Sequence, residues 1–373
     1  MRYFYILFFI IILKINLSAQ ILHPEYICNL PSSLTESSGL FTISENEFWS
    51  FEDSGNADEL VKIDNQGTKI KTVKISNASN EDWEAMTDDG QYTYIGDVGN
   101  NTSNRTNLVI YKISTINNVL GTSISPQKIN FTYEDQIDFN PPIGSWEFDC
   151  ESILAINDSL YLFSKDYTVP FKGQTKVYKL SKSPTKQVAK LVTLISTNDQ
   201  NYNLGQITDA AISPNKKVIV LLANSGMYVF DNFEISNFWN GRKRFFQFDS
   251  KLQREGVSFL NDSIIYLTNE FSTNGDAALY KLNLSNILTS SNSIINISDL
   301  NITYFIENQW LNIQSNKSLK NIEIFDFQGK IIEKKDLKME QNIQFPLSIA
   351  SGNYILRVET MDNKEWVQKI RID

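Results

Sequence analysis

The chain has 373 residues, of which 42% are hydrophobic and 21% are charged, and its formal net charge is −9. A chain of this length can form two domains with substantial cores. Its acidic balance makes nucleic acid and anionic membranes poor partners, and it favours cations or basic ligands.

The first residues predict a secretory signal peptide over residues 1–19. Arg2 supplies a positive charge, the apolar run ILFFIIIL follows, and Ser18-Ala19-Gln20 offers a cleavage site with small residues. An N-terminal membrane anchor is the alternative, but the run is short and Lys14 interrupts it. No later segment reaches the ~20 apolar residues that a bilayer span needs. We therefore expect a mature chain outside the cytoplasm, either secreted or attached to the cell surface.

The chain has two cysteines, Cys28 and Cys150. Both remain after signal cleavage, and an extracytoplasmic compartment permits oxidation. A disulfide between them would close a long loop and stabilise the fold by about 4 kcal/mol in the chain-entropy model. Two buried free thiols are the alternative, so the sequence leaves the state of the cysteines open.

Residues 20–288 repeat a pattern of short strands. Each repeat opens with an acid, continues with an apolar strand and a polar turn, and then has a stronger apolar strand. Four short strands in a unit of this length are typical of a β-propeller blade. We therefore predict an all-β fold with a five- or six-bladed β-propeller, and a chain of β-sandwiches is the alternative. The repeats begin at Glu36, Glu84, Glu151, Asp209 and Glu255.

The C-terminal part of the chain has a different pattern. Residues 289–300 are rich in Ser, Asn and Ile and are expected to form a linker. Residues 301–373 alternate apolar and polar positions, which predicts a small β-sandwich. This segment has ten basic and ten acidic residues, so the acidic excess belongs to the propeller.

The tail resembles the type A C-terminal sorting domain of type IX secretion in the Bacteroidota. The resemblance lies in NIEIFDFQGKII (321–332), LSIASGNYILRVET (347–360) and the terminal strand VQKIRID. An ordinary immunoglobulin-like accessory module is the alternative. The resemblance implies that the type IX secretion machinery exports the chain from the periplasm across the outer membrane, for release or anchoring at the cell surface.

The acids of the repeats are expected to gather at one mouth of the propeller. The first two strands of a blade are antiparallel, so the start of the first strand and the end of the second lie at the same face. Converging carboxylates repel one another, and calcium accepts six to eight oxygen ligands. The candidate calcium ligands are Glu36, Asp53, Glu84, Asp97, Glu151, Asp209, Glu255 and Glu270.

Other arrangements could compensate these acids. They could be protonated, or they could pair with Arg105, Lys165 or Arg254. They could also accept hydrogen bonds from backbone amides and fix the register of the blades. Trp83 and Trp146 lie beside the acidic motifs, and we expect them to pack between blades rather than to stack on a sugar.

Four scattered motifs resemble the phytase-like and esterase-like β-propeller family over residues 36–282. They are DWEAM…GDVGNN…NR, FDCESI…LFSKD, QITDAAIS and REGVSF…LTNE. The resemblance implies an acidic face that holds calcium and hydrolyses phosphate esters. Lys165 and Arg105 would then be candidate catalytic residues that meet an anionic group, and a metal would activate water. A non-catalytic propeller that binds a ligand or protein is the alternative.

The single histidine, His23, makes a Ser-His-Asp triad or a histidine-built zinc site unlikely chemistry for this chain. The sequence also lacks a phosphate-binding glycine loop of the P-loop or dinucleotide type. The site that the family resemblance implies, with carboxylates, Lys165, Arg105 and a metal ion, needs no histidine.

Overall fold

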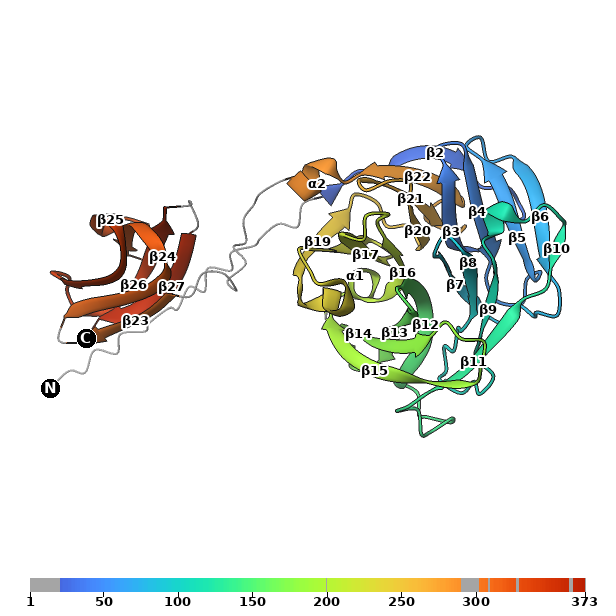
Figure 1. Ribbon diagram of the computed structural model, residues 1–373, viewed down its shortest axis with the longest axis horizontal. Helices are drawn as coiled ribbons and strands as arrows, with labels where there is room; N and C mark the ends of the chain where they lie inside the picture. The colour runs from blue at the N-terminus through green and yellow to red at the C-terminus, as the bar shows by residue number, and fades with distance from the viewer. Residues whose placement is uncertain are drawn as a thin grey trace, which may run out of the picture. The chain divides into compact units, whose positions relative to one another are not determined.

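The computed structural model describes residues 21–198, 200–289, 302–307, 309–326, 329–361 and 365–372 (Figure 1). The chain divides into two compact units, Met1–Ser285 and Asn286–Asp373. The predicted signal peptide lies outside the described residues, as does the predicted linker apart from its first residue. No helix among the described residues is long and apolar enough to cross a membrane.

The first unit is a five-bladed propeller with four antiparallel strands in each blade. Blade 1 is β3 (Ser37–Ser44), β4 (Glu47–Glu52), β5 (Glu59–Asp64) and β6 (Lys69–Ile75), and blade 2 is β7 (Trp83–Asp88), β8 (Tyr92–Asp97), β9 (Val109–Ser114) and β11 (Gln127–Tyr133). Blade 3 is β12 (Ser145–Ile156), β13 (Ser159–Thr168), β14 (Gln174–Ser181) and β15 (Gln187–Ser196). Blade 4 is β16 (Ile207–Ile212), β17 (Val218–Ala223), β18 (Gly226–Asp231) and β19 (Arg242–Phe248). Blade 5 is β20 (Arg254–Phe259), β21 (Ile264–Asn269), β22 (Ala278–Asn283) and the N-terminal strand β2 (Glu25–Asn29).

The blades form a closed ring. Their inner strands β3, β7, β12, β16 and β20 contact one another in this order, and β20 contacts β3 again. Figure 1 shows these strands around the propeller axis. The ring closes because β2 pairs with β22, with Tyr26 opposite Tyr280. The structure therefore confirms the predicted propeller and sets the number of blades at five.

Short parallel strands cover several outer edges of the blades. β1 (Ile21–Leu22) pairs with β19, and β10 (Ser123–Ile124) pairs with β6. β11 pairs with β15, which joins blades 2 and 3 into one sheet of eight strands. Covered edges cannot pair with another chain, which protects the propeller against edge-to-edge aggregation.

Aromatic side chains fill the spaces between blades. Trp83 is fully buried, its indole N–H donates to the Ser79 carbonyl at 2.9 Å, and its ring lies 5.6 Å from that of Phe51 in blade 1. This confirms the packing role that we predicted for Trp83. Trp146, by contrast, is only half-buried.

Cys28 and Cys150 are both free and buried, which is the alternative to the disulfide that the sequence had left open. Cys28 packs with Leu40 and Leu279 where blade 5 meets blade 1, whereas Cys150 belongs to the core cluster of blades 2 and 3. The ring is closed by strand pairing rather than by a disulfide. Burial raises the pKa of the Cys28 thiol to about 11 and that of Cys150 to about 12, so both are unreactive thiols.

The second unit is a small antiparallel β-structure with an apolar core, in agreement with the predicted C-terminal sandwich. Its long strand β24 pairs with three others, and β26 pairs with β27. The core includes Leu311, Ile322, Leu356 and Ile370. The strands are β23 (Ile302–Glu307), β24 (Trp310–Phe325), β25 (Ile331–Pro346), β26 (Gly352–Thr360) and β27 (Glu365–Ile372).

Candidate functional site at the acidic mouth of the propeller

Each inner strand has a β-bulge, which lies near the start of four strands and at Glu151, within the strand, in β12. In β7, Trp83 is opposite Asp97 and Ala85 is opposite Gly96, so Glu84 has no cross-strand partner. A bulge of this kind bends the strand and re-aims the extra side chain. The five bulge residues are Ser38, Glu84, Glu151, Thr208 and Glu255.

The bulges correct the alignment of the repeats. Glu36 lies two residues before its bulge and is exposed, and it accepts a hydrogen bond from Asn56 at 2.8 Å. Asp209 lies one residue after its bulge, is buried, and accepts hydrogen bonds from the backbone N–H groups of Ala210 (2.8 Å) and Val257 (2.7 Å). Asp209 therefore has the register-fixing role that was the alternative to metal binding.

Two D-x-E motifs bring four carboxyl groups together where blades 2 and 3 meet. Glu84 and Glu151 are bulge residues, and Asp82 and Asp149 precede them by two positions. Ser38 donates to Glu84 Oε2 at 2.8 Å across the boundary with blade 1. We call these four carboxyls the D-x-E cluster and the surrounding end of the propeller axis the acidic mouth.

The sequence analysis did not select Asp82 or Asp149, although the repeated D-x-E spacing was a usable signal. Asn100 N–H donates to Asp149 Oδ1, whereas the buried Asp149 Oδ2 has no hydrogen-bond partner. Gly99 is required beside Asp82, because a Cβ atom on it would lie 2.2 Å from Asp82 Oδ2. This close approach explains why Gly99 of GDVGNN accompanies the DWE motif.

Two basic residues compensate part of the charge, as one alternative had predicted. Lys165 Nζ lies 3.1 Å from Glu151 Oε2. Arg105 Nη2 lies 2.8 Å from Asp97 Oδ1, and its Nη1 donates to the Gly99 carbonyl at 2.7 Å. Arg105 is thus held in place beside the mouth, and Asp97 is an ion-paired residue.

Arg254 was a candidate partner for the acids of the mouth, but the structure gives it a different role. Its guanidinium group is buried, donates to the carbonyls of Asn224 (3.1 Å) and Ser250 (3.2 Å), and lies 4.2 Å from the centre of the Phe248 ring. These contacts join blades 4 and 5 rather than neutralise the acidic mouth.

The D-x-E cluster is short of positive charge. Burial, followed by the charge of Glu151, raises the pKa of Glu84 and of Asp149 well above the ordinary range of a carboxyl. Burial alone would lower the pKa of Lys165, but the charges of Glu151 and Glu255 raise it well above its usual value. The direction of these shifts favours the protonated form of Lys165 and the neutral forms of Glu84 and Asp149.

Further carboxyls around the mouth titrate near neutral pH. Burial raises the pKa of Glu255 to about 8, although Lys165 opposes the shift. Burial and the charge of Glu255 raise the pKa of Glu270 to about 9, and burial raises that of Asp53 to about 7. Gln253 donates to Glu270, and Glu255 Oε2 is a second buried oxygen without a hydrogen-bond partner.

The mouth is not a preformed metal site. Among the residues that the structure describes, no three Asp, Glu, His or Cys side chains are arranged to hold one metal ion. The carboxylate oxygens have the chemistry that calcium prefers. However, Lys165 occupies one oxygen of Glu151, and the pKa of the neighbouring Glu84 is raised, which favours its protonated form.

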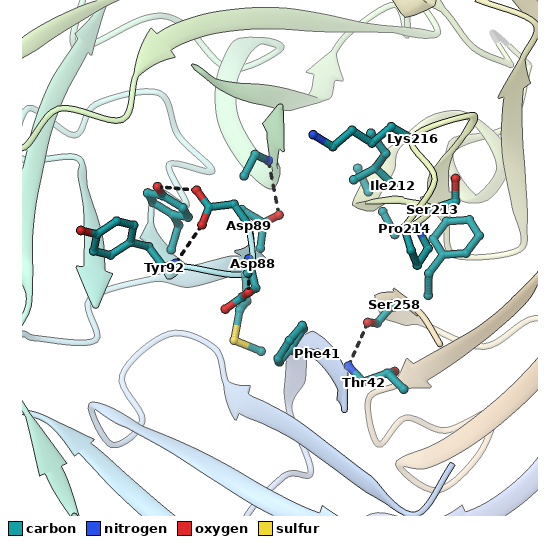
Figure 2. A pocket seen from close by; sticks show the side chains of 18 of the residues that line it. Phe41, Thr42, Asp88, Asp89, Tyr92, Ile212, Ser213, Pro214, Lys216 and Ser258 are labelled. Atoms are coloured by element: carbon teal, nitrogen blue, oxygen red, sulfur yellow. Dashed lines mark hydrogen bonds between the residues drawn. The ribbon is translucent and has the colours of Figure 1, made fainter. Parts of the chain in front are cut away.

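A cavity of about 750 Å³ lies at the opposite mouth, where the turns between first and second strands gather. Figure 2 shows Asp89 of blade 2 on one side of it and Lys216 of blade 4 on the other. Asp89 accepts hydrogen bonds from Lys182 Nζ (2.7 Å) and Tyr94 Oη (3.0 Å). None of the site residues that the sequence predicted lines this cavity.

Comparison with known proteins identifies the second unit. Residues 307–373 match the family described as the secretion system C-terminal sorting domain. No curated protein matches the chain. The family assignment agrees with the tail motifs and covers most of the second unit.

Solved structures give weaker likenesses. PorZ, an essential bacterial surface component of the type IX secretion system of Porphyromonas gingivalis, is 10% identical with a TM-score of 0.32. The match covers 90% of this chain but 45% of PorZ, so the chain spans less than half of that protein. The PQQ-bound aldose sugar dehydrogenase of Streptomyces coelicolor is 8% identical with a TM-score of 0.42, and 71% of this chain and 98% of that one are covered. Neither likeness bears on the activity of this chain.

The C-terminal unit is a type IX secretion sorting domain, and the protein that carries it is exported to the cell surface or secreted.

Proposed function

We propose that the propeller is an exported binding protein that holds a positively charged ligand in its acidic mouth. The observation that best supports this proposal is the D-x-E cluster, whose four acids lie near one lysine, Lys165. The four acids are Asp82, Glu84, Asp149 and Glu151. Residues 1–19 would act as the signal peptide, and the sorting domain would engage the type IX machinery in a member of the Bacteroidota.

A cation would relieve the cost of this arrangement. Lys165 compensates the carboxylates only in part, so burial favours the protonated acids, and each unit of pKa shift corresponds to about 1.4 kcal/mol. A bound cation lowers these pKa values, so its binding is coupled to proton release. It would also give a partner to the unpaired oxygens of Asp149 and Glu255.

The test is calorimetric titration of the chelator-treated mature chain with calcium chloride and, separately, with spermidine at pH 7. We expect saturable binding of at least one cation, and weaker binding to the Glu84→Gln and Glu151→Gln variants. Glu234→Gln is the matched control, because Glu234 is an exposed acid of blade 4 outside the mouth. Absence of binding by both cations, or equal binding by all variants, would contradict the proposal.

Calcium-dependent hydrolysis of an ester or phosphoester is the second candidate. The observation in its favour is that Glu255 and Asp53 have pKa values of about 8 and 7, which suit proton exchange at neutral pH. Lys165 is better placed than Arg105 to meet an anionic group, since Lys165 is paired with one carboxylate, Glu151, whereas Arg105 is held by Asp97 and Glu81. Glu151 could ligate calcium through both oxygens only after Lys165 moved away.

Turnover of generic phosphate and carboxyl esters, with and without calcium, tests the second candidate. We expect calcium-dependent turnover that is lost in Glu255→Gln and kept in Glu234→Gln. Inert protein across the ester panel would reject hydrolysis and leave the binding proposal in place.

A further inference from the structure

Large apolar side chains are exposed on loops at the acidic mouth. Ile137 and Ile143, on the loop between β11 and β12, are 91% and 87% exposed. Val169, which follows β13, is 70% exposed, and Tyr202 in the short helix α1 (Tyr202–Gly205) is 47% exposed. The loop of Ile137 and Ile143 precedes β12, the first strand of blade 3, and α1 precedes β16, the first strand of blade 4. Val169 follows β13, the second strand of blade 3. All three segments therefore lie at the same end of the propeller as the D-x-E cluster.

Backbone and ring contacts connect the loops that carry these side chains. Val169 N–H donates to the Gly144 carbonyl at 2.9 Å, and a Cβ atom on Gly144 would lie 3.0 Å from Val169 Cβ. Farther along the same loop, the Phe171 ring lies 4.5 Å from the Tyr202 ring. The loop of Val169 and Phe171 therefore connects the backbone beside Ile143 to Tyr202. We call Ile137, Ile143, Val169, Phe171 and Tyr202 the apolar rim.

A rim of this kind is typical of an interaction surface. Single exposed apolar side chains are common on protein surfaces, but neighbouring ones beside a functional site mark binding surfaces. Interfaces commonly place apolar contacts next to polar groups that set the choice of partner. Here the polar neighbour is acidic, since Asp149 and Glu151 lie on β12, the strand that follows the loop of Ile143. The complementary partner has apolar side chains next to a basic one.

The shape of the rim favours a peptide over a small molecule. Ile137 and Ile143 are exposed on a loop, and neither lines the cavity of about 750 Å³ at the opposite mouth. An extended segment can lay alternate side chains on such a surface while one side chain enters the mouth. We propose that the acidic mouth and the apolar rim bind a peptide segment of a partner protein, with Lys or Arg at the D-x-E cluster and apolar residues on the rim. This inference rests on the proposed function and adds the class of the ligand.

Fluorescence anisotropy with labelled peptides tests the inference on the mature chain with its sorting domain. The probe is a heptapeptide that alternates Leu and Lys, and two matched peptides replace Lys by Glu or Leu by Ser. We expect the Leu-Lys peptide to bind roughly tenfold or more tightly than either matched peptide. The double variant Ile143→Ser/Val169→Ser should weaken its binding to a similar extent. Leu120→Ser is the control, because Leu120 is 95% exposed in the connection between the third and fourth strands of blade 2, at the other mouth.

The outcomes separate the inference from the proposed function. Equal affinity of the double variant and Leu120→Ser for the Leu-Lys peptide would overturn the inference. If this peptide still bound better than the Glu peptide, the proposed function would stand. If neither this peptide nor a cation bound, both would fail. A second copy of the chain is the other possible occupant of the rim, and light scattering tests for it. A dimer that the double variant abolishes would assign the rim to a second copy of the chain and overturn the inference.

Discussion

Glu255→Gln is the substitution that most sharply tests whether the mouth lacks positive charge. The pKa of Glu255 is about 8 in the folded protein against an ordinary value of 4.5. An acid with a raised pKa binds more protons in the folded state than in the unfolded state, so its presence lowers stability as the pH rises from about 4.5 to about 8. Glutamine keeps the shape of the protonated acid and has no such dependence.

The expected gain in the free energy of unfolding follows from the size of the pKa shift of Glu255. At pH 7 the unfolded chain has Glu255 ionised, whereas the folded chain holds it largely protonated, which costs about 1.4 kcal/mol for each pH unit above the unfolded pKa. Glu255→Gln should therefore be more stable than the wild-type protein by about 3 kcal/mol at pH 7, and by little at pH 4.5.

Urea unfolding at pH 4.5, 6 and 7 measures this difference directly. The free energy of unfolding of the variant should exceed that of the wild type by an amount that increases with pH, while Glu234→Gln should change it little at any of these pH values. A variant that is equally stable or less stable at pH 7 would refute the reasoning, because it would show that the folded state favours ionised Glu255.

Three further predictions concern the same region and the cysteines. Lys165→Met should lower the free energy of unfolding by about 3 kcal/mol in chemical denaturation, because it leaves the buried Glu151 without its partner; an unchanged value would mean that the ion pair contributes nothing. Gly99→Ala should lower the free energy of unfolding by roughly 1–3 kcal/mol, because the added Cβ displaces Asp82. Gly121→Ala is the control and should lower it less, since its Cβ would lie 3.5 Å or more from its neighbours. Similar losses for the two variants in thermal or urea unfolding would contradict the packing argument. A thiol assay on unfolded, non-reduced protein should find both cysteines reactive, and a lack of reactive thiols would restore the disulfide.

The sequence predicted the propeller because its signals are local. Alternating apolar residues and turn residues define each strand, and the repeated acids mark the start of each blade. The blade count was left open because β2 joins blade 5 from the other end of the sequence, and pairing of this kind leaves no local signal. The disulfide hypothesis failed for a related reason, since compartment and cysteine number do not show that Cys28 and Cys150 lie in different core clusters.

The sequence predicted that acids gather at one mouth of the propeller, but it did not predict which residues are equivalent from blade to blade. Alignment on acids treated Glu36 and Asp209 as equivalents of Glu84, whereas the bulges make Ser38 and Thr208 the equivalent residues. A bulge shifts a strand by one residue without a distinctive residue type, so sequence alone does not locate it. The cavity at the opposite mouth was missed because separate turns from several blades line it.

Proton release on cation binding tests the central claim most directly. Calcium chloride or spermidine is added to chelator-treated, weakly buffered mature protein at pH 7 in a pH-stat, and the base needed to hold the pH is counted. We expect saturable release of protons from the mouth, and less release from Glu84→Gln than from Glu234→Gln. Saturable cation binding with no proton release would contradict it, because the carboxyls of the mouth would then already be ionised.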